Sequence, residues 1–329
     1  MSLQFQLLGR PQVLQDGRDA TGEVGAKALA VITFLALAPT ARVTRSKVAG
    51  TFWPDKTEEA ARYRLRHLLW DLRKTLESDC IGSDNAECWF NPEGATVDAL
   101  ELRRGAGTLG LDSAQYIPTA EQASQLAALA ELYHGDLFDG LPVREAPLFD
   151  EWLFVERERL HLLYLDLLWA LARALQSAGD CAGAARTLAR SIQLDPLRER
   201  NYRALMAVYY QAGDRSAATQ AFHQCESTLS AELGVAPSPE TRQLYNRIVR
   251  GTTSSVETDL RRAGELVEQG RLADAFTLCA TAEPLATDPI IRSQLSLLRA
   301  EIAIRQGKAV DSLSLLQSAR QAIASLIRG

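Results

Sequence analysis

A repeated pattern in the second half of the chain constrains the fold more than any other feature. The segments "SAGDCAGAARTLARS" and "YQAGDRSAATQAFHQ" both carry Ala-Gly-Asp, and Gly179 and Gly213 are 34 residues apart. This period is typical of tetratricopeptide helix pairs. Gly270 and Gly307 stand in similar segments 37 residues apart. We therefore expect four antiparallel helix pairs after residue 119.

The residue types in this repeat have a physical explanation. Glycine adopts the backbone conformation of a tight turn between two helices at little cost. An alanine five residues later lets the second helix approach closely, and the alanines in question are Ala184, Ala218 and Ala275. A proline-broken insert over residues 232–255 separates the second pair from the third, and we expect it to contain its own helix.

The first hundred residues follow a different order, namely strands, three helices and a hairpin. "LQFQLLG" alternates apolar and polar residues, which predicts a strand, and an Asp16-Gly17 turn lies just beyond a second one. The expected helices span residues 25–38, 44–53 with Thr44 as N-cap, and 58–76 with Thr57 as N-cap. "CIGSDNAECWFN" then predicts a hairpin, "GATVD" one more strand, and residues 104–118 a linker.

Composition excludes several classes of protein. The 329 residues are 47% hydrophobic, which suits globular domains, but no run of about 18 apolar residues could span a bilayer. The first residues lack the features of a signal peptide, so we expect a cytoplasmic protein. The five cysteines and four histidines are scattered without ligand-like spacing, so neither a metal site nor a disulfide framework is predicted. We expect the cysteines to be small core residues.

Charge is distributed unevenly along the chain. The whole sequence has a formal net charge of −5, yet residues 42–74 contain nine Lys or Arg residues and four acids. A local basic segment on an acidic protein favours a polyanionic partner more than the overall charge does.

The third expected helix contains most of this basic segment. On a helical projection of "ARYRLRHLLWDLRKTL" (residues 61–76), one face is apolar and comprises Ala61, Leu65, Leu68, Leu72 and Leu76. The opposite face comprises Arg62, Tyr63, Arg66, His67, Trp70, Arg73 and Lys74. Most basic helix faces are merely solvated. An exposed Trp70 among cations instead favours a contact surface, because indole is unfavourable in water.

Such a helix fits the major groove of double-stranded DNA, where arginine pairs with guanine and other cations neutralise phosphates. The second helix would cross the backbone and the hairpin would act as a wing, which gives a winged helix-turn-helix. We expect base contacts from Arg62, Arg66, Tyr63 and Trp70. We expect phosphate contacts from Thr44, Arg45, Lys47, Lys56, Arg64, Arg73 and Lys74.

These residues resemble one family. "ARYRLRHLLWDLRKTL" is similar to the recognition helix of Streptomyces antibiotic regulatory proteins (SARPs), and "LFDGLPVREAPLFDEWLFVERERLHLLYLDLLWALA" and "ELGVAPSPETRQLYNRI" resemble their activator domain. The resemblance covers residues 1–250. It implies a mainly α protein with an OmpR-like winged helix-turn-helix of α+β type, followed by an all-α, tetratricopeptide-like domain. The expected domains are the winged helix at 1–103, the bacterial transcriptional activator domain at 104–250, and additional repeats at 251–329.

The resemblance implies a bacterial transcriptional activator without enzymatic activity, cofactor or membrane association. Its implied partners are double-stranded DNA carrying promoter repeats, RNA polymerase holoenzyme, and a second copy as a homodimer or in tandem. Tyr63 and Trp70 depart from the residues common in the family, so the base preference does not carry over. Asp84 and Glu87 make the expected wing unfavourable next to phosphate.

Enzymatic alternatives have little support in the sequence. "GEVGAK" (residues 22–27) lacks the spacing of a phosphate-binding loop, and no nucleophile elbow occurs. Trp152, Tyr164 and Trp169 are better explained as core residues than as a cofactor site. The main alternative is a tetratricopeptide scaffold or sensor that acts through protein contacts, with a winged helix that does not bind DNA.

Overall fold

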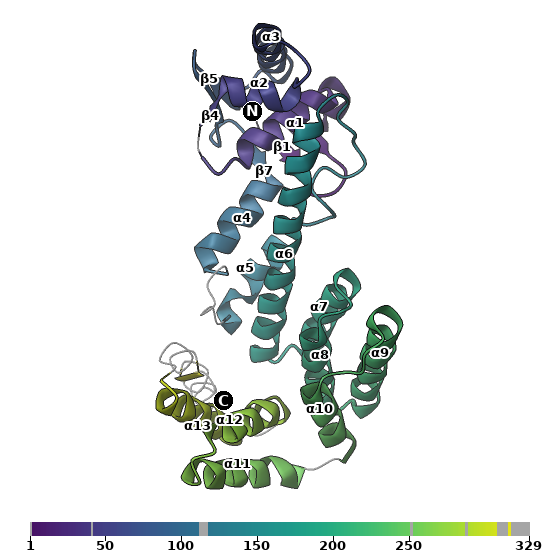
Figure 1. Ribbon diagram of the computed structural model, residues 1–329, viewed down its shortest axis with the longest axis vertical. Coiled ribbons are helices and arrows are strands. Elements are labelled where there is room, and N and C mark those ends of the chain that lie inside the picture. Colours follow the sequence, from purple (N-terminus) through teal and green to yellow (C-terminus); the bar gives the residue numbers. More distant parts are fainter. Residues whose placement is uncertain are drawn as a thin grey trace. The chain divides into compact units, whose positions relative to one another are not determined.

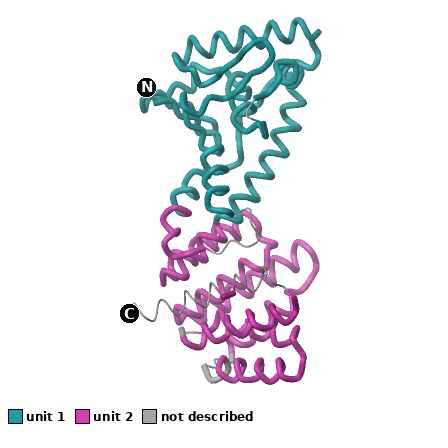
Figure 2. The backbone as a smooth tube through the Cα atoms, turned by 90° about the vertical axis from the view of Figure 1, so that its left-hand side faces the viewer, with its two compact units in different colours: residues 1–112, 127–167 teal, residues 113–126, 168–329 magenta. Residues whose placement is uncertain are grey.

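The computed structural model describes residues 2–40, 42–111, 118–250, 253–286, 289–307 and 315–316. The chain divides into two compact units, which Figure 2 colours separately. Unit 1 comprises residues 1–112 and 127–167, and unit 2 comprises residues 113–126 and 168–329. The predicted fold class is confirmed, because a small α+β region precedes a succession of helices (Figure 1).

Four short strands of unit 1 form one sheet in the order β3-β2-β1-β7. Their bounds are β1 (Leu3–Gln6), β2 (Gln12–Gln15), β3 (Arg18–Asp19) and β7 (Thr96–Val97). β1 pairs antiparallel with β2, as predicted, and parallel with β7. The predicted turn joins β2 to β3, with φ of 50° at Asp16 and 80° at Gly17. A 3-10 helix η1 (Thr21–Glu23) follows β3.

Three helices and a second sheet complete the N-terminal region. The helices are α1 (Ala26–Ala36), α2 (Arg45–Phe52) and α3 (Glu58–Leu76), close to the predicted bounds. The second sheet has the order β4-β6-β5, with strands β4 (Val43–Thr44), β5 (Ile81–Ser83) and β6 (Glu87–Phe90). The predicted hairpin is therefore present as β5 and β6. The "GATVD" segment does form a strand, β7, but it joins the first sheet.

Helix α4 (Asp98–Leu109) corrects the predicted linker. Residues 104–109 are helical, and residues 112–117 lie outside the described part of the chain. Glycine occurs here partly because the helix packs closely: a Cβ atom at Gly105 would lie 2.4 Å from a methyl group of Leu129. Gly105 therefore serves packing in this helix, whereas a Cβ atom at Gly107 would meet nothing within 4 Å.

A buried carboxylate joins α4 to the first sheet. Asp98 is only 8% exposed, and its two oxygens accept hydrogen bonds from the backbone N–H groups of Leu7, Leu8 and Ala99 at 2.7–3.0 Å. Burial raises the pKa of Asp98, although these hydrogen bonds oppose the rise. This contact fixes the start of α4 against the residues that follow β1.

The first part of α6 (Pro147–Ser177) packs against the helices of the N-terminal region. The ring of Trp152 lies 5.0 Å from that of Phe34, and the ring of Phe149 lies 5.1 Å from that of Phe52. Tyr164, further along α6, is fully buried and stacks on Tyr133 at 4.1 Å. The prediction of core positions for Trp152 and Tyr164 is confirmed. Helix α5 (Ala123–Ala130) and the 3-10 helix η2 (Ala120–Gln122) precede this segment.

After α6 come α7 (Cys181–Leu194), α8 (Glu199–Gln211), α9 (Arg215–Leu233), α10 (Pro239–Arg250), α11 (Thr253–Glu268), α12 (Leu272–Ala282) and α13 (Pro289–Arg305). Three of the four expected helix pairs lie within the described residues, namely α6 with α7, α8 with α9, and α11 with α12. The turn glycines have φ of 85°, 84°, 75° and 75° at Gly179, Gly213, Gly270 and Gly307. Ala184, Ala218 and Ala275 are completely buried, as expected. Most residues after Gly307, including any partner of α13, lie outside the described residues.

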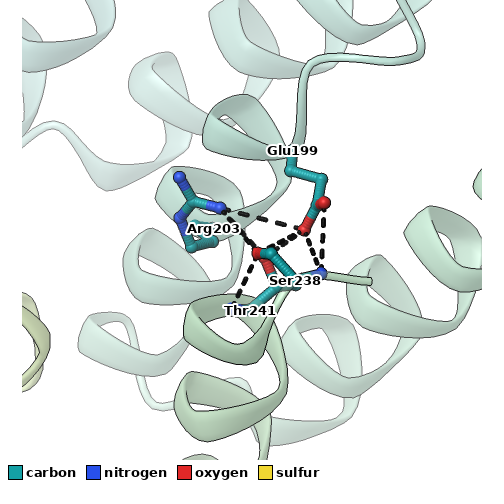
Figure 3. A network of polar contacts seen from close by, with 4 residues as sticks. All are labelled: Glu199, Arg203, Ser238 and Thr241. Carbon is teal, nitrogen blue, oxygen red and sulfur yellow. Dashed lines mark hydrogen bonds and ion pairs between the residues drawn. The ribbon is translucent and has the colours of Figure 1, made fainter. Parts of the chain in front are cut away.

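Helix α10 is the predicted helix of the insert, and a polar network fixes its start to α8 (Figure 3). The Glu199 carboxylate accepts hydrogen bonds from the backbone N–H and hydroxyl of Ser238 and from the hydroxyl of Thr241. Arg203 donates to Thr241 at 3.0 Å. Burial disfavours the charged form of Glu199 and acts to raise its pKa, but the hydrogen bonds from Thr241 and Ser238 have the larger combined effect. The pKa of Glu199 is therefore lowered.

Four cysteines, Cys80, Cys88, Cys225 and Cys279, are buried as predicted, while Cys181 is half-buried. Burial raises the pKa of the Cys80 and Cys225 thiols to about 11. These thiols are therefore protonated core side chains at neutral pH. Among the described helices, none combines the length and apolar character needed to cross a membrane.

Candidate nucleic-acid interface

Helix α3 has two faces, as predicted, with one change. Its buried residues are Ala61, Leu65, Leu69, Leu72 and Leu76. Leu68 was expected in this set, but it is only half-buried and Leu69 is buried instead. On a helical projection, Leu68 and Leu69 lie at opposite edges of the buried arc. Helical periodicity alone therefore does not decide which of the two is buried.

Two aromatic side chains stand out on the opposite face. Tyr63 is 59% exposed and Trp70 is 57% exposed. The Arg66 guanidinium lies 5.4 Å from the centre of the Tyr63 ring, and the Lys74 ammonium lies 5.3 Å from the centre of the Trp70 ring. Neither cation makes an ion pair with any residue that the structure describes. The outward face of α3 therefore presents two exposed aromatic–cation pairs, which we call the α3 contact face.

Two other side chains of α3 are paired along the helix itself. Arg62 lies 3.1 Å from the carboxylate of Glu58, and His67 lies 2.8 Å from that of Asp71. All four side chains are more than half exposed. Exposed pairs at this spacing are worth about 0.3–0.5 kcal/mol, so a phosphate can displace the carboxylate.

Arg73 has a different environment from the one expected of a phosphate contact. Its Nε and one terminal nitrogen donate to the backbone oxygen of Ile81 at 3.3 and 3.1 Å, and the same terminal nitrogen donates to the Ser83 hydroxyl at 2.9 Å. These acceptors belong to β5. Arg73 therefore joins the end of α3 to the hairpin, and its guanidinium is already occupied.

Helix α2 precedes α3 and packs against it. The Thr44 hydroxyl caps α2 by accepting from the backbone N–H of Lys47, as predicted. The side chains of Lys47 and Lys56 are exposed and make no ion pair within the described residues. The Thr44 hydroxyl is used by the cap, whereas the two lysines remain available to an anion.

Lys27 and Arg64 add charge to this surface in a way that the sequence did not reveal. The Lys27 ammonium donates to the backbone oxygen of Phe52 at 3.2 Å and lies 5.4 Å from the centre of the Trp53 ring. Burial is the main reason that the pKa of Lys27 is lowered, and the nearby charge of Arg64 lowers it further. The second residue of α1 thus brings a cation close to Arg64 of α3.

The hairpin tip has its own charge balance. Asp84 accepts from the backbone N–H groups of Ala86 and Glu87 at 2.8 Å, and these bonds lower its pKa. Arg42 lies 3.2 Å from Asp84 and stacks 3.9 Å from the centre of the Trp89 ring. Arg45 donates to the backbone oxygen of Asp84 at 3.1 Å. Arg42, a residue to which the sequence gave no role, therefore offsets part of the negative charge of the two acids that make the wing unfavourable.

Comparison with known families identifies the region that follows the hairpin. Residues 97–249 match the bacterial transcriptional activator domain. Regulatory protein AfsR of Streptomyces coelicolor is 27% identical over 259 residues, which cover 78% of this chain. Transcriptional regulatory protein MoaR1 of Mycobacterium tuberculosis is 28% identical over 233 residues, which cover 68% of this chain. The chain therefore contains a region that matches the bacterial transcriptional activator domain, and it is similar to these transcriptional regulators.

The relatives of this chain differ in length. The aligned region is 72% of MoaR1 but only 25% of AfsR, so the chain spans about a quarter of the larger relative. A solved structure with the same fold is that of Mycobacterium tuberculosis EmbR in complex with a low-affinity phosphopeptide. Its TM-score is 0.57 with 22% sequence identity, and the match covers 81% of this chain and 71% of EmbR. The predicted resemblance to SARPs is confirmed.

Proposed function

We propose that this protein is a transcriptional regulator of the SARP type, a sequence-specific, double-stranded DNA-binding activator that places α3 in the major groove. The α3 contact face supports this proposal most strongly, because it holds two exposed aromatic–cation pairs opposite a buried leucine stripe. A solvated helix face does not require exposed Tyr63 and Trp70, whereas arginine and aromatic side chains both recognise base edges. The hairpin that follows α3 serves as the wing.

The side chains divide into three roles in this proposal. Arg66, Tyr63 and Trp70 contact base edges, and Arg62 joins them when it leaves Glu58. The phosphates are contacted by Lys47, Lys56, Lys74, Arg64 and Arg45, with Thr44 at the start of α2. Arg73 acts chiefly as a positioning residue, since its guanidinium already holds the hairpin against α3. Arg42 offsets the acids of the wing.

The repeat region supplies protein contacts in this proposal. Similarity to these transcriptional regulators supports recruitment of RNA polymerase holoenzyme and binding as a homodimer or in tandem on promoter repeats. Two linked binding events raise affinity by increasing effective concentration, which compensates for the small footprint of one winged helix. The division into a winged helix, an activator domain and further repeats is part of the same proposal. The protein then acts in the cytoplasm without catalysis.

A scaffold or sensor role is the second candidate. Helix α6 favours it, because Phe154 is 74% exposed and Leu148 and Val155 are nearly half exposed on the same element. Exposed apolar side chains of this size are typical of protein contacts. A scaffold of this kind would not bind duplex DNA at moderate salt. A duplex-binding measurement at moderate salt therefore distinguishes the two candidate functions.

A substitution series on promoter DNA tests the proposal. Fluorescence anisotropy would measure the affinity of the full chain for a duplex from upstream of neighbouring genes and for a scrambled duplex. We expect Arg66→Ala to weaken binding to the promoter duplex by about 1–3 kcal/mol. Its affinities for the promoter duplex and for the scrambled duplex should therefore differ less than those of the wild type. Arg18→Ala is the matched control, because Arg18 is an exposed arginine paired with Glu23 away from α3. Unchanged promoter affinity in Arg66→Ala would show that α3 does not read the DNA.

A further inference from the structure

Helix α3 carries a carboxylate on the same face as its exposed aromatic side chains. Glu59, Tyr63, Arg66 and Trp70 follow one another at spacings of four, three and four residues. At about 100° per residue, these four side chains lie within about 60° of one another around the helix axis. Glu59 therefore lies on the α3 contact face, one helical turn before Tyr63.

The two acids at the start of α3 differ in their partners. Glu58 forms an ion pair with Arg62 at 3.1 Å. Glu59 is exposed, and it makes no hydrogen bond or ion pair with any residue in the described part of the chain. A carboxylate on a DNA-contacting face is repelled by the phosphates, so its position there is unfavourable unless a base donates a hydrogen bond to it.

A hollow in the surface lies beside Glu59 at the start of α3. Its lining comprises Thr57, Glu59, Ala60, Tyr63 and Arg64, and it is open to solvent. The Thr57 hydroxyl is used by the helix cap, since it accepts from the backbone N–H of Ala60 at 3.4 Å. Glu59, Tyr63 and Arg64 therefore offer this hollow an acceptor, an aromatic ring and a cation.

The end of α3 that holds the hollow is the end expected to approach the bases. In helix-turn-helix proteins, the N-terminal residues of the recognition helix contact the base edges. Glu59 lies in the first turn of α3, and the neighbouring Tyr63 side chain is 59% exposed. A base edge that meets this end of the α3 contact face therefore meets a carboxylate and an aromatic ring together.

The chemistry of the base edges selects the partner of a carboxylate. In the major groove, guanine and thymine present acceptors, which a carboxylate repels. Adenine presents an amino donor next to the N7 acceptor, whereas cytosine presents only its N4 amino donor. Given the proposed function, which places α3 in the major groove, we propose that Glu59 determines specificity for one cytosine of the operator by accepting a hydrogen bond from its N4 amino group.

Selection of bound sequences tests this role without knowledge of the operator. The full chain would be incubated with a pool of duplexes of random sequence, and the bound duplexes would be sequenced. The wild type should prefer cytosine at one position, and Glu59→Ala should lose this preference while it keeps those at the other positions. Glu101→Ala is the matched control, because Glu101 is an exposed acid on α4, outside the α3 contact face. It should keep every preference of the wild type.

Anisotropy titrations on single duplexes measure the size of the effect. The wild type should bind the selected duplex about fivefold or more tightly than the same duplex with another base pair at that position. Glu59→Ala should bind the two duplexes alike, and it should bind the second one more tightly than the wild type does, because a charge that repels phosphates has been removed. A role of Glu59 in helix stability alone would instead weaken binding to both duplexes by the same factor.

Glu59→Gln provides the decisive variant. Glutamine is close to glutamate in shape, but its amide pairs with adenine through both N6 and N7. The preferred base at this position should therefore change from cytosine to adenine. Because Glu59 is exposed and has no partner within the described residues, both variants should fold, which circular dichroism checks. If Glu59→Ala does not fold, the change of base in Glu59→Gln decides the matter alone.

Three results would overturn the assignment of Glu59. If Glu59→Ala selects the same sequence as a selective wild type, Glu59 does not determine specificity and the proposed function stands. The same conclusion follows if the preference that is lost concerns a base other than cytosine. If the wild type binds all duplexes of the pool alike, or binds none, the assignment of Glu59 and the proposed function fail together.

Discussion

Arg73 and Lys74 are neighbours on α3, yet they are available for different tasks. Arg73 donates hydrogen bonds to Ile81 and Ser83 in the hairpin, whereas Lys74 lies over the exposed ring of Trp70. Loss of the first side chain removes a connection within the protein. Loss of the second removes only a charge at the surface. The two substitutions should therefore separate stability from DNA affinity.

We predict that Arg73→Ala lowers the free energy of unfolding of the N-terminal region by about 1 kcal/mol, the usual net worth of such hydrogen bonds. Lys74→Ala should change stability by less than about 0.5 kcal/mol, as surface substitutions commonly do, and should weaken binding to all DNA sequences alike. Urea unfolding followed by tryptophan fluorescence measures the first effect, and anisotropy measures the second. Equal stability of the two variants would refute the positioning role of Arg73.

Asp98 should make stability depend on pH in a definite direction. Burial raises its pKa in the folded chain, so the folded state holds the proton more tightly than the unfolded state does. Its contribution to stability is then greatest below the unfolded value, about 3.9, and declines as pH rises through the raised pKa. In Asp98→Asn this dependence should be absent. Urea midpoints of both proteins across pH 4–7 check this, and parallel pH profiles would contradict it.

Side-chain exposure was easier to predict than side-chain partners. Helical spacing correctly placed Tyr63 and Trp70 on the outside and Leu65 in the core, because burial follows from position on the helix. The partners of Arg73 and Arg42 depend on how the hairpin returns to α3 and β4. Ile81 and Ser83 lie 8 and 10 residues after Arg73, and Asp84 lies 42 residues after Arg42. In both cases the chain turns between the partners, and helical periodicity contains no information about the turn.

At the level of elements, the turn glycines of the repeats make a direct prediction. Gly213 has φ of 84°, where an alanine side chain is strained. Gly213→Ala should lower stability by about 1–2 kcal/mol, and Gly213→Asn by less, because asparagine tolerates this conformation better. Gly264→Ala is the control, since this glycine lies within α11 with open space around it. It should instead stabilise the helix by roughly 0.5–1 kcal/mol.

Thermal unfolding followed by circular dichroism measures all three glycine variants. A Gly213→Ala midpoint as high as that of Gly264→Ala would refute the explanation of the repeat. The comparison is informative because both substitutions add the same methyl group, and only the backbone conformation of the glycine differs.

Elements with local signals were predictable, and elements defined by distant partners were not. Thr44 and Thr57 cap α2 and α3 as expected, because a cap depends on neighbouring residues only. Strand β7 pairs with β1 across about ninety residues, so the sequence indicated a strand but not its sheet. The small residues of α4 suggested a linker, although Gly105 serves contact with Leu129.

At the scale of the whole molecule, an acidic protein carries a local basic surface on α2 and α3. The fold class was predictable, because repeat spacing and helix amphipathicity are strong signals in the sequence.

If two copies bind in tandem, the affinity for promoter DNA should depend on the number and spacing of its repeats. Two copies on neighbouring repeats should bind about tenfold or more tightly than one copy on a single repeat. Insertion of half a helical turn, about 5 base pairs, should abolish this gain, because it places the sites on opposite faces of the duplex. Gel-shift titrations on one-repeat, two-repeat and spaced duplexes measure the effect. A gain that persists in the spaced duplex would rule out direct contact between the copies.

The salt dependence of duplex binding tests the central claim most directly. If α2 and α3 neutralise several phosphates, the logarithm of the binding constant should fall linearly with the logarithm of salt concentration, with a slope of about −0.9 for each phosphate. We predict a steep slope for the wild type, reduced by about one in Lys74→Ala. Absence of duplex binding at moderate salt, or a slope near zero, would contradict the assignment of α3 as a DNA-reading helix.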